Sequence, residues 1–319
     1  MVRRMTNKRS APKRQHYVPR LYLRNFAIPH KADSKIERVH VYERGGTKPR
    51  VSGINKIAVV KDFYTVIDPE TDEKDYSLEE FFNSIEGIAA REIAGLITND
   101  NVVFDEERKR KLAPFIGCLA VRTLQHLQWE ENFLDEESKR YSSLLQQDPE
   151  SFLKMYFSEE VLEVFGEDRI LEIVKDETFI GGVLDNLSQT RQPRAVNRGL
   201  KIANILMKKN WILGIRETSK VLVTSDHPVV TLRPQGVPEK ARSGFAKGII
   251  CMPLSPDRCL IMFHQKLKPG LPSKSVDSIN HGQMHHAHKE IYSHANISGI
   301  QNQFNKTKEG EGTEVKLDW

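Results

Sequence analysis

The chain has 319 residues, of which 39% are hydrophobic and 29% are charged, so it can bury a sizeable core beneath an ordinary charged surface. It holds no apolar run of membrane-spanning length, no apolar secretory segment behind its charged N-terminus, and three cysteines without metal-ligand spacing. We therefore expect a cytoplasmic protein with no membrane partner, no disulfide framework and no cysteine-based zinc site.

Charge is distributed unevenly along the sequence. Residues 1–50 hold 14 Lys and Arg against 3 Asp and Glu, whereas residues 62–187 hold 12 against 30. Basic surfaces attract phosphate polymers and acidic surfaces repel them, so RNA or DNA should bind near the ends of the chain. The acidic middle is expected to be a set of solvated helices.

Residues 1–14 predict a disordered basic arm, because basic side chains occur there without apolar periodicity. The arm residues that would bind nucleic acid are Arg3, Arg4, Lys8, Arg9, Lys13 and Arg14. Behind the arm, Pro19 predicts the start of a short helix. Strands are then predicted at 39–42, 57–60 and 63–67.

The middle of the chain predicts helices. The segment from Ser77 to Glu80 has the form of a capping box, and apolar residues recur behind it at helical spacing. A second long helix is predicted at 106–131, and further helices follow to about Met207. Beyond them, strands are predicted at 211–215, 221–224, 229–232, 249–252 and 259–263, and a last helix at 275–292.

This order of elements predicts an α+β fold. The strands before Ser77 are too few to form a stable sheet alone, so we expect one mixed sheet assembled from N- and C-terminal strands. The helices between them would form an inserted subdomain at 77–207. Residues 15–305 would then be a single domain, followed by a loose tail at 306–319.

Several short motifs resemble the pattern of one family. The first runs from Gln15 to Phe26 and reads QHYVPRLYLRNF, and the last is Asn280. Between them lie Phe63–Tyr64, Leu78–Glu79 with Ile85–Glu86, Phe115–Arg122, Thr224–Pro228 and Pro253–Pro256. In this order the motifs resemble the domain of unknown function 4238 family over about residues 15–295. The resemblance implies one family-wide domain and marks candidate positions, but it implies no activity.

The first motif holds His16 close to Arg20 and Arg24. These arginines are four residues apart and would share one face of a helix, where two guanidinium groups can bind one phosphate. His16 would then be a general acid or base, or a metal ligand. Alternatively, His16 braces the entry of the chain into the core.

Two predicted helices carry charges that border their apolar faces. Glu79 and Glu86 lie nearly on one line of the first helix, and Arg122 leans inward from the second. Because a buried arginine needs a carboxylate partner, we predict that Glu86 contacts Arg122. The pair could serve helix packing alone. In the functional alternative, Glu79 and Glu86 bind Mg²⁺ or Mn²⁺ beside Arg122.

The motif from Thr224 to Pro228 follows a predicted strand, where functional groups often lie. Asp226 is predicted to be a general base or a further metal ligand, and an Asx-type turn is the alternative. Ser225 could be a nucleophile, but it lacks the Gly-x-Ser-x-Gly surroundings of a nucleophile elbow.

Three histidines fall on one face of the predicted last helix, His281, His285 and His288. Two histidines four residues apart can bind zinc, but the glutamate of the zinc-protease motif is missing and Gly282 weakens the helix. A solvated histidine cluster is the alternative.

Together these patterns favour an enzyme that acts on nucleic acid by metal-dependent phosphodiester hydrolysis, in host defence or as a toxin. Its catalytic residues would be His16, Glu86, Arg122 and Asp226. We also predict that His16 and Asp226 lie in one cleft, because the strands that they flank would share a sheet. One alternative is a non-catalytic protein that binds RNA or DNA. Another is a small-molecule hydrolase or transferase that uses His16 and Asp226.

Overall fold

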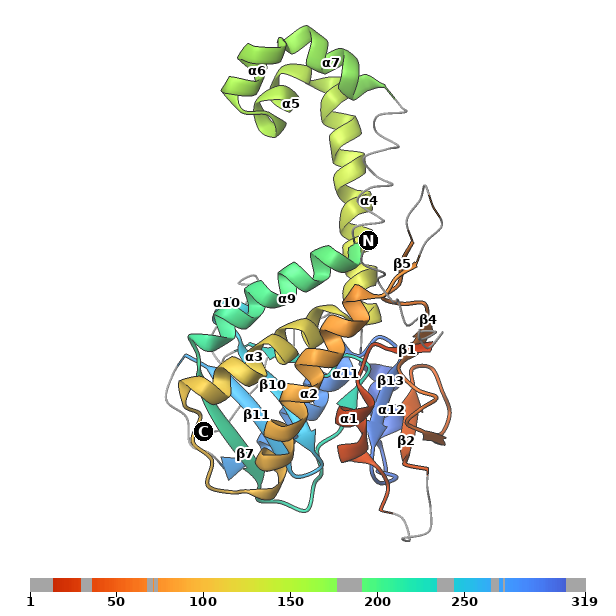
Figure 1. Ribbon diagram of the computed structural model, residues 1–319. Coiled ribbons are helices and arrows are strands. Elements are labelled where there is room, and N and C mark those ends of the chain that lie inside the picture. The colour runs from red at the N-terminus through yellow and green to blue at the C-terminus, as the bar shows by residue number, and fades with distance from the viewer. Residues whose placement is uncertain are drawn as a thin grey trace, which may run out of the picture. The chain divides into compact units, whose positions relative to one another are not determined.

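A computed structural model describes residues 14–29, 36–67, 71, 74–176, 191–233, 244–264, 270–271 and 273–307. The predicted tail beyond Thr307 lies outside these residues, as do the arm residues Arg3, Arg4, Lys8, Arg9 and Lys13. Helices and antiparallel sheets make up the described chain (Figure 1), which confirms the α+β class.

The chain divides into two compact units. The first contains the residues up to Gln125 and those from Ala195 onward, and the second contains His126–Arg194. All of the described strands belong to the first unit, whereas the described elements of the second are helices. The predicted insertion at 77–207 therefore supplies helices to both units.

Strands from both ends of the chain form a four-stranded antiparallel sheet in the first unit, in the order β3-β2-β13-β8. Its strands are β2 (Arg38–Glu43), β3 (Arg50–Gly53), β8 (Thr224–Ser225) and β13 (Glu290–Ser293). The predicted joining of N-terminal and C-terminal strands is therefore confirmed, but these strands form an antiparallel sheet of their own rather than one mixed sheet with the remaining C-terminal strands. β13 lies at the centre of this joining, because it pairs with β2 on one side and β8 on the other.

The other C-terminal strands form a second sheet, in the order β12-β7-β11-β10-β9. Its strands are β7 (Asn210–Arg216), β9 (Val230–Leu232), β10 (Ile249–Ser255), β11 (Arg258–Phe263) and β12 (Gly270–Leu271). β12 runs parallel to β7 and the other pairs are antiparallel, so this sheet is mixed. Nearly every residue of β10 and β11 is buried, as expected of strands with both faces covered.

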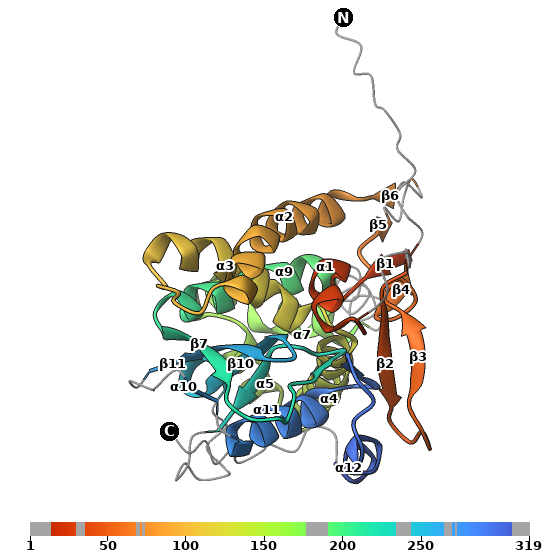
Figure 2. The same ribbon diagram turned by 90° about the horizontal axis from the view of Figure 1, so that it is seen from below.

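Helices cover both faces of the second sheet (Figures 1 and 2). α2 (Ser77–Thr98), α3 (Glu106–Val121) and α9 (Arg191–Met207) lie over one face, and α11 (Ser273–His286) lies over the other. Val276 and Ile279 of α11 share a hydrophobic core with residues of the sheet. α3 and α9 approach closely, since a Cβ atom added to Gly117 would lie 2.2 Å from the carbonyl oxygen of Gly199.

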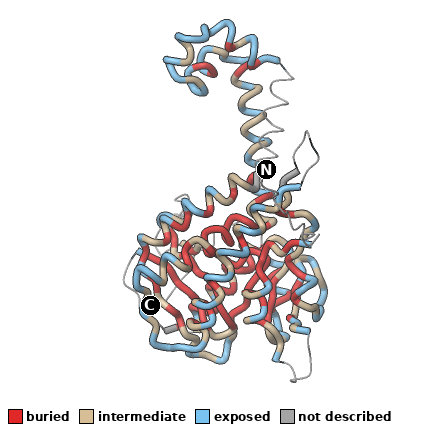
Figure 3. The backbone as a smooth tube through the Cα atoms, viewed as in Figure 1, coloured by how far each residue is buried: buried red, intermediate tan, exposed pale blue. Residues whose placement is uncertain are grey.

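Short elements complete the first unit. They are β1 (Arg14–His16) paired with β4 (Val59–Lys61), β5 (Val66–Ile67) paired with β6 (Lys74–Asp75), α1 (Arg20–Leu23), the 3₁₀ helix η1 (Arg24–Phe26), α10 (Gly244–Lys247) and α12 (Ile300–Lys306). Pro19 precedes α1, so the predicted short helix is confirmed. Buried residues are concentrated in the sheets and helices of the first unit (Figure 3).

The second unit is built from most of α4 (Leu124–Gln147) with α5 (Pro149–Tyr156), α6 (Glu159–Phe165) and α7 (Glu167–Lys175). α5 begins where the Asp148 carboxylate accepts a hydrogen bond of 3.0 Å from the N–H of Ser151. A small apolar core holds these helices together, formed by Leu145, Phe152, Leu153, Ile170 and Val174.

Two predicted helices are wrong in extent. The helix predicted at 106–131 is broken at Arg122 and Thr123, where the chain passes from α3 to α4. The helix predicted at 275–292 ends at His286, and β13 follows it. The second error has a physical cause, because the carboxylate of Asp226 binds the N–H groups of residues 288–290. None of the described helices combines the length and apolar character that crossing a membrane requires.

Candidate functional site

Two neighbouring helices place a buried ion pair in the first unit. α2 begins after Asp75, whose carboxylate accepts hydrogen bonds from the N–H and the hydroxyl of Ser77. This helix carries Glu86, and the break after α3 carries Arg122. Nη1 of Arg122 lies 2.8 Å from Oε1 of Glu86. The predicted contact between these two side chains is therefore confirmed.

The surroundings of Arg122 favour its charged form. The residue is 1% exposed, and its guanidinium carbon lies 4.8 Å from the centre of the Phe82 ring. Burial opposes the charge, but Tyr64 and Glu86 outweigh it and raise the pKa of Arg122. A planar cation is thus held permanently inside the protein.

The guanidinium group of Arg122 has unused hydrogen-bonding capacity. Its Nη1 atom pairs with Oε1 of Glu86 at 2.8 Å, whereas its Nε and Nη2 atoms make no hydrogen bond with the described residues. Because a buried charged donor without an acceptor is costly, and the guanidinium fork matches phosphate, Arg122 is a candidate for binding an anion.

Gln15 organises the groups around this pair. It is 4% exposed, and its Oε1 accepts a hydrogen bond of 2.6 Å from the N–H of Tyr64. Its Nε2 donates to Oε2 of Glu79 at 2.7 Å. Burial raises the pKa of the Tyr64 hydroxyl, which the charge of Arg122 opposes. We call Gln15, Tyr64, Glu79, Glu86 and Arg122 the Arg122 cluster.

His16 does not join this cluster. Gln15 and His16 are successive residues of β1, so their side chains leave opposite faces of the strand. The His16 Nε2 atom lies 3.3 Å from the carbonyl oxygen of Ile54. Burial lowers the pKa of His16, and the nearby charge of Arg20 adds to this effect. The geometry corresponds to the alternative in which His16 braces the N-terminal segment, and the predicted catalytic role has no contact that supports it.

Asp226 is bound to the main chain rather than exposed in a cleft. Its Oδ1 accepts from the N–H of His288 at 2.9 Å, and its Oδ2 accepts from those of Lys289 and Glu290 at 2.7 and 3.1 Å. Burial nevertheless raises the pKa of Asp226 to about 6. Because both oxygens hold β13 beside β8, this carboxylate is a structural connection rather than the predicted general base.

A chain of hydroxyl groups lies beside Asp226. Tyr292 donates to Oε2 of Glu290 at 2.7 Å, and Tyr17 interacts with Tyr292. Burial raises the pKa of Tyr17, and the carboxylates of Asp226 and Glu290 raise it further. Tyr17 also interacts electrostatically with Tyr64. Tyr17, and not His16, therefore connects the first motif with Asp226.

A second contact joins the helix break to the loop of Asp226. Oγ1 of Thr123 lies 2.6 Å from Nδ1 of His227, and the His227 ring stacks on that of His286 with centroids 5.7 Å apart. The periodicity of an unbroken helix gave no signal for Thr123. Ser225 is fully buried and its hydroxyl contacts Gln283 at 2.7 Å, so no contact supports the Ser225 nucleophile.

The predicted metal ligands are not brought together in the described residues. Glu79 is bonded to Gln15, Glu86 contacts Arg122, and Asp226 binds N–H groups. Across the described ranges, no three side chains of His, Cys, Asp and Glu are placed to hold a metal ion. These carboxylates therefore do not fit the expected Mg²⁺ or Mn²⁺ site.

The predicted histidine face is also incomplete. The rings of His281 and His285 meet edge to face with centroids 4.4 Å apart. His288, however, follows the end of α11, and its N–H is bonded to Asp226. The three histidines therefore do not lie on one helix, as the zinc-binding hypothesis required.

The basic residues of the first motif lie at the surface. Arg14 and Arg20 are exposed, and Nε of Arg24 pairs with Oε1 of Glu37 at 3.0 Å. α1 ends at Leu23, so Arg20 and Arg24 do not share one α-helix as expected. Any nucleic acid bound by Arg14 and Arg20 would be held at the surface, because neither side chain points into a buried site.

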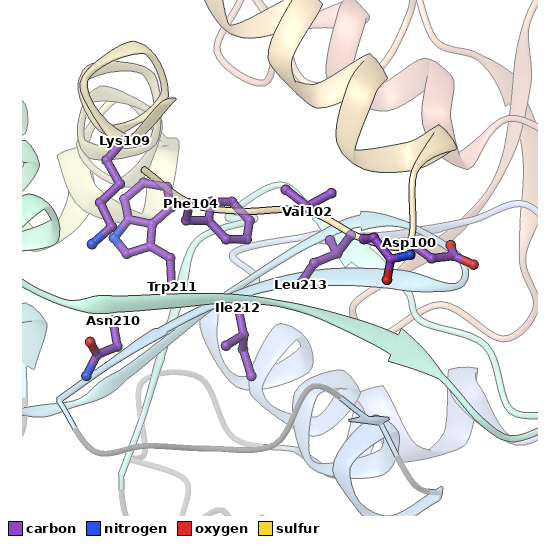
Figure 4. A pocket seen from close by; sticks show the side chains of 9 residues that line it. Asp100, Val102, Phe104, Lys109, Asn210, Trp211, Ile212 and Leu213 are labelled. Atoms are coloured by element: carbon purple, nitrogen blue, oxygen red, sulfur yellow. The ribbon is translucent and has the colours of Figure 1, made fainter. Parts of the chain in front are cut away.

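A pocket of about 440 Å³ lies elsewhere in the first unit (Figure 4). Residues 100–102, Phe104, Lys109 and the start of β7 line it, and none of them belongs to the Arg122 cluster. Its polar groups serve neighbouring segments: Asp100 bonds Arg258 at 2.6 Å, and Lys109 bonds the carbonyl oxygen of Lys209 at 2.8 Å. These two polar groups are therefore engaged in structural contacts, and we do not assign the pocket a catalytic role.

Several of the motifs that carry the family resemblance supply residues to the Arg122 cluster or interact with it. The first supplies Gln15 and Tyr17, the next two supply Tyr64 and both glutamates, and later ones supply Arg122 and Asp226. The family pattern described as protein of unknown function (DUF4238) matches residues 14–296. No curated protein and no solved structure gives a significant match. Since the family pattern covers most of its length, this chain belongs to the DUF4238 family of proteins of unknown function.

Proposed function

We propose that this protein hydrolyses phosphodiester bonds in nucleic acid, with Arg122 binding the phosphate and His227 transferring the proton. The main support is the buried guanidinium of Arg122, whose Nε and Nη2 atoms make no hydrogen bond with the described residues. The next residue in the chain, Thr123, contacts His227. An anion-binding group and a titratable ring are the two components that this reaction needs.

The proposed step uses only groups of the chain and one water molecule. In the proposed step the imidazole of His227, whose Nδ1 lies 2.6 Å from Oγ1 of Thr123, takes a proton from water. The hydroxide oxygen attacks phosphorus, the bond from phosphorus to the leaving oxygen breaks, and that oxygen receives the proton from the imidazolium ring. Arg122 stabilises the charge that develops on the non-bridging oxygens.

The charge of the two units supports nucleic acid as the substrate class. Residues 126–194 hold 7 Lys and Arg against 16 Asp and Glu, and the rest of the chain holds 41 against 27. The Arg122 cluster belongs to the basic part. A basic surface raises the local concentration of a polyanion and speeds its association.

The test is hydrolysis of labelled single- and double-stranded RNA and DNA, together with bis(p-nitrophenyl) phosphate. Each substrate is tried with Mg²⁺, with Mn²⁺ and with a chelator. We expect Arg122→Lys and His227→Gln each to lower kcat/KM by about 100-fold or more, because a lysine lacks the planar fork and a glutamine cannot transfer the proton.

Matched substitutions away from the cluster serve as controls. Arg108 lies in the same unit and pairs with Glu92 at 3.0 Å, so Arg108→Lys should leave the rate unchanged. His264 is exposed, so His264→Gln should do the same. The proposal fails if wild-type protein cleaves none of the substrates, or if the rates of Arg122→Lys and His227→Gln match those of the controls.

Burial favours one alternative, a non-catalytic protein that binds RNA or DNA. Arg122 and Thr123 are almost fully buried and His227 is 8% exposed, as in a polar network that only holds elements together. In that case nucleic acid binds without being cleaved, and Arg122→Lys lowers the melting temperature without affecting affinity. Measuring affinity and cleavage on the same substrates distinguishes the two functions.

A further inference from the structure

The second unit exposes large apolar side chains that its own core does not cover. Met155 and Tyr156 end α5, Val164 and Phe165 end α6, and Ile173 lies on α7. Between 38% and 75% of each of these residues is exposed. We call these five side chains the helical surface. Clusters of exposed large apolar side chains often mark interaction sites.

α6 shows the lack of cover most clearly. Its seven residues, Glu159–Phe165, include four large apolar side chains, and none of the seven is buried. Val161 and Leu162 pack partly against the core of the unit, whereas Val164 and Phe165 are the most exposed members of the helical surface. An amphipathic helix normally buries its apolar stripe, whereas the apolar residues at the end of α6 remain exposed.

The exposed ends of these helices lie in one neighbourhood. Lys154 precedes Met155, and its charge interacts with that of Glu167. Glu167 begins α7 two residues after Phe165. Figure 1 shows α5, α6 and α7 gathered together within this unit. The apolar residues of α5 and α6 can therefore contact a single bound partner.

Acidic residues predominate in the segment that carries this apolar surface. Residues 148–176 hold nine Asp and Glu against three Lys and Arg. Two of the acidic residues begin α6, Glu159 and Glu160, and two begin α7, Glu167 and Asp168. Such a charge repels nucleic acid and attracts a basic partner.

We propose that the helical surface binds a basic amphipathic helix of a partner protein. The apolar face of that helix would pack on Val164, Phe165 and Met155, and its lysines and arginines would face the carboxylates of this segment. This role does not depend on the Arg122 cluster, so the protein could bind its partner whether or not it cleaves nucleic acid.

The test uses the full chain and two synthetic peptides in calorimetric titration. One peptide consists of Leu and Lys patterned as an amphipathic helix, and the other has Glu at each Lys position. We expect the basic peptide alone to bind, more weakly at high salt. The double substitution Val164→Ser with Phe165→Ser should weaken binding by about tenfold or more. Val103 is 75% exposed in the first unit, so Val103→Ser should leave the affinity unchanged.

Three outcomes would overturn the proposal. One is that neither peptide binds, or that both bind equally. Another is that Val164→Ser with Phe165→Ser leaves the affinity of the basic peptide unchanged, or that Val103→Ser weakens it as much. The third is that the wild-type chain self-associates in sedimentation analysis and the double variant does not, which would identify a second copy of the chain as the occupant. Circular dichroism of each variant confirms that the helices are retained.

Discussion

Nε2 of Gln15 donates a hydrogen bond of 2.7 Å to Oε2 of Glu79, a residue 64 positions further along the chain. The same side chain accepts from the N–H of Tyr64. One buried amide therefore joins the first strand, the turn before β5 and helix α2. This gives the first motif a physical role that does not require a catalytic His16.

We expect Gln15→Ala to lower the free energy of unfolding by about 2–3 kcal/mol, because the N–H of Tyr64 and the carboxylate of Glu79 lose their partner. His16→Ala should cost about 1 kcal/mol or less, since His16 makes one long contact to a main-chain oxygen. Urea unfolding of both variants gives the comparison.

A charge substitution at the same position separates packing from hydrogen bonding. Gln15→Glu keeps the shape and the acceptor for Tyr64 but places a carboxylate against Glu79. It should destabilise the fold, and the second substitution Glu79→Gln should restore most of the loss. A larger loss in His16→Ala than in Gln15→Ala would contradict this assignment.

Arg122→Ala should lower the free energy of unfolding by about 3–5 kcal/mol, because it leaves Glu86 without its buried partner. Replacing both members, as Glu86→Leu with Arg122→Met, should recover most of this loss, since apolar pairs replace buried ion pairs well. Arg108→Ala breaks a more exposed pair with Glu92 and should cost about 1 kcal/mol. Equal losses in Arg122→Ala and Arg108→Ala would refute the buried role.

The contact of Glu86 with Arg122 could be predicted because both residues lie on strongly periodic segments. The apolar spacing indicates which side of each helix is buried. Because a buried charge without a partner is costly, the inward-facing Arg122 is then expected to pair with the nearby Glu86. The same spacing gave no signal for Thr123. Apolar residues recur at helical spacing on both sides of residues 122 and 123, so the sequence predicts one unbroken helix. The break is seen only in the structure, where Thr123 contacts His227.

The period of a strand could have corrected the prediction for His16. In β1 the side chain of Gln15 should face one way and that of His16 the other. β13 offered no such signal, because Glu290–Ser293 follows helical spacing without a turn motif. What ends α11 is the carboxylate of Asp226, whose position depends on a segment more than 60 residues away.

His286 should make stability depend on pH. Burial lowers its pKa to about 4, although the carbonyl oxygen of Thr231 opposes the shift. Since its ordinary value is 6.5, the unfolded chain binds a proton between these two values and the folded chain does not. Stability from this group is thus complete above pH 6.5 and is lost as the pH falls towards 4, by up to about 3 kcal/mol.

The comparison of wild type with His286→Phe isolates this effect. Phenylalanine keeps a ring to stack on His227 but cannot bind a proton. The difference in unfolding free energy between the two proteins should therefore shrink or reverse in favour of the variant as the pH is lowered from 7 to 4.5. A difference that is constant over this range would show that His286 is protonated equally in both states.

Asp226 should act in the opposite direction over nearly the same range. Burial raises its pKa to about 6 from an ordinary value of 3.8, so the folded chain holds a proton that the unfolded chain has released. The associated stability is present in full below pH 3.8 and is lost as the pH rises through 6, by up to about 3 kcal/mol. The three N–H groups that bind the carboxylate favour its charged form and limit the shift.

Asp226→Asn tests this carboxylate directly. The variant keeps one oxygen for the N–H groups of residues 288–290 but turns an amide N–H₂ towards the others, so it should be less stable than wild type at every pH. Because asparagine does not titrate, the stability difference between wild type and variant should grow as the pH falls from 7 to 4. The effect of His286 cancels, since both proteins carry it. A difference that instead shrinks with falling pH would mean that the three hydrogen bonds outweigh burial, and that Asp226 is an anion bound by main-chain N–H groups throughout this range.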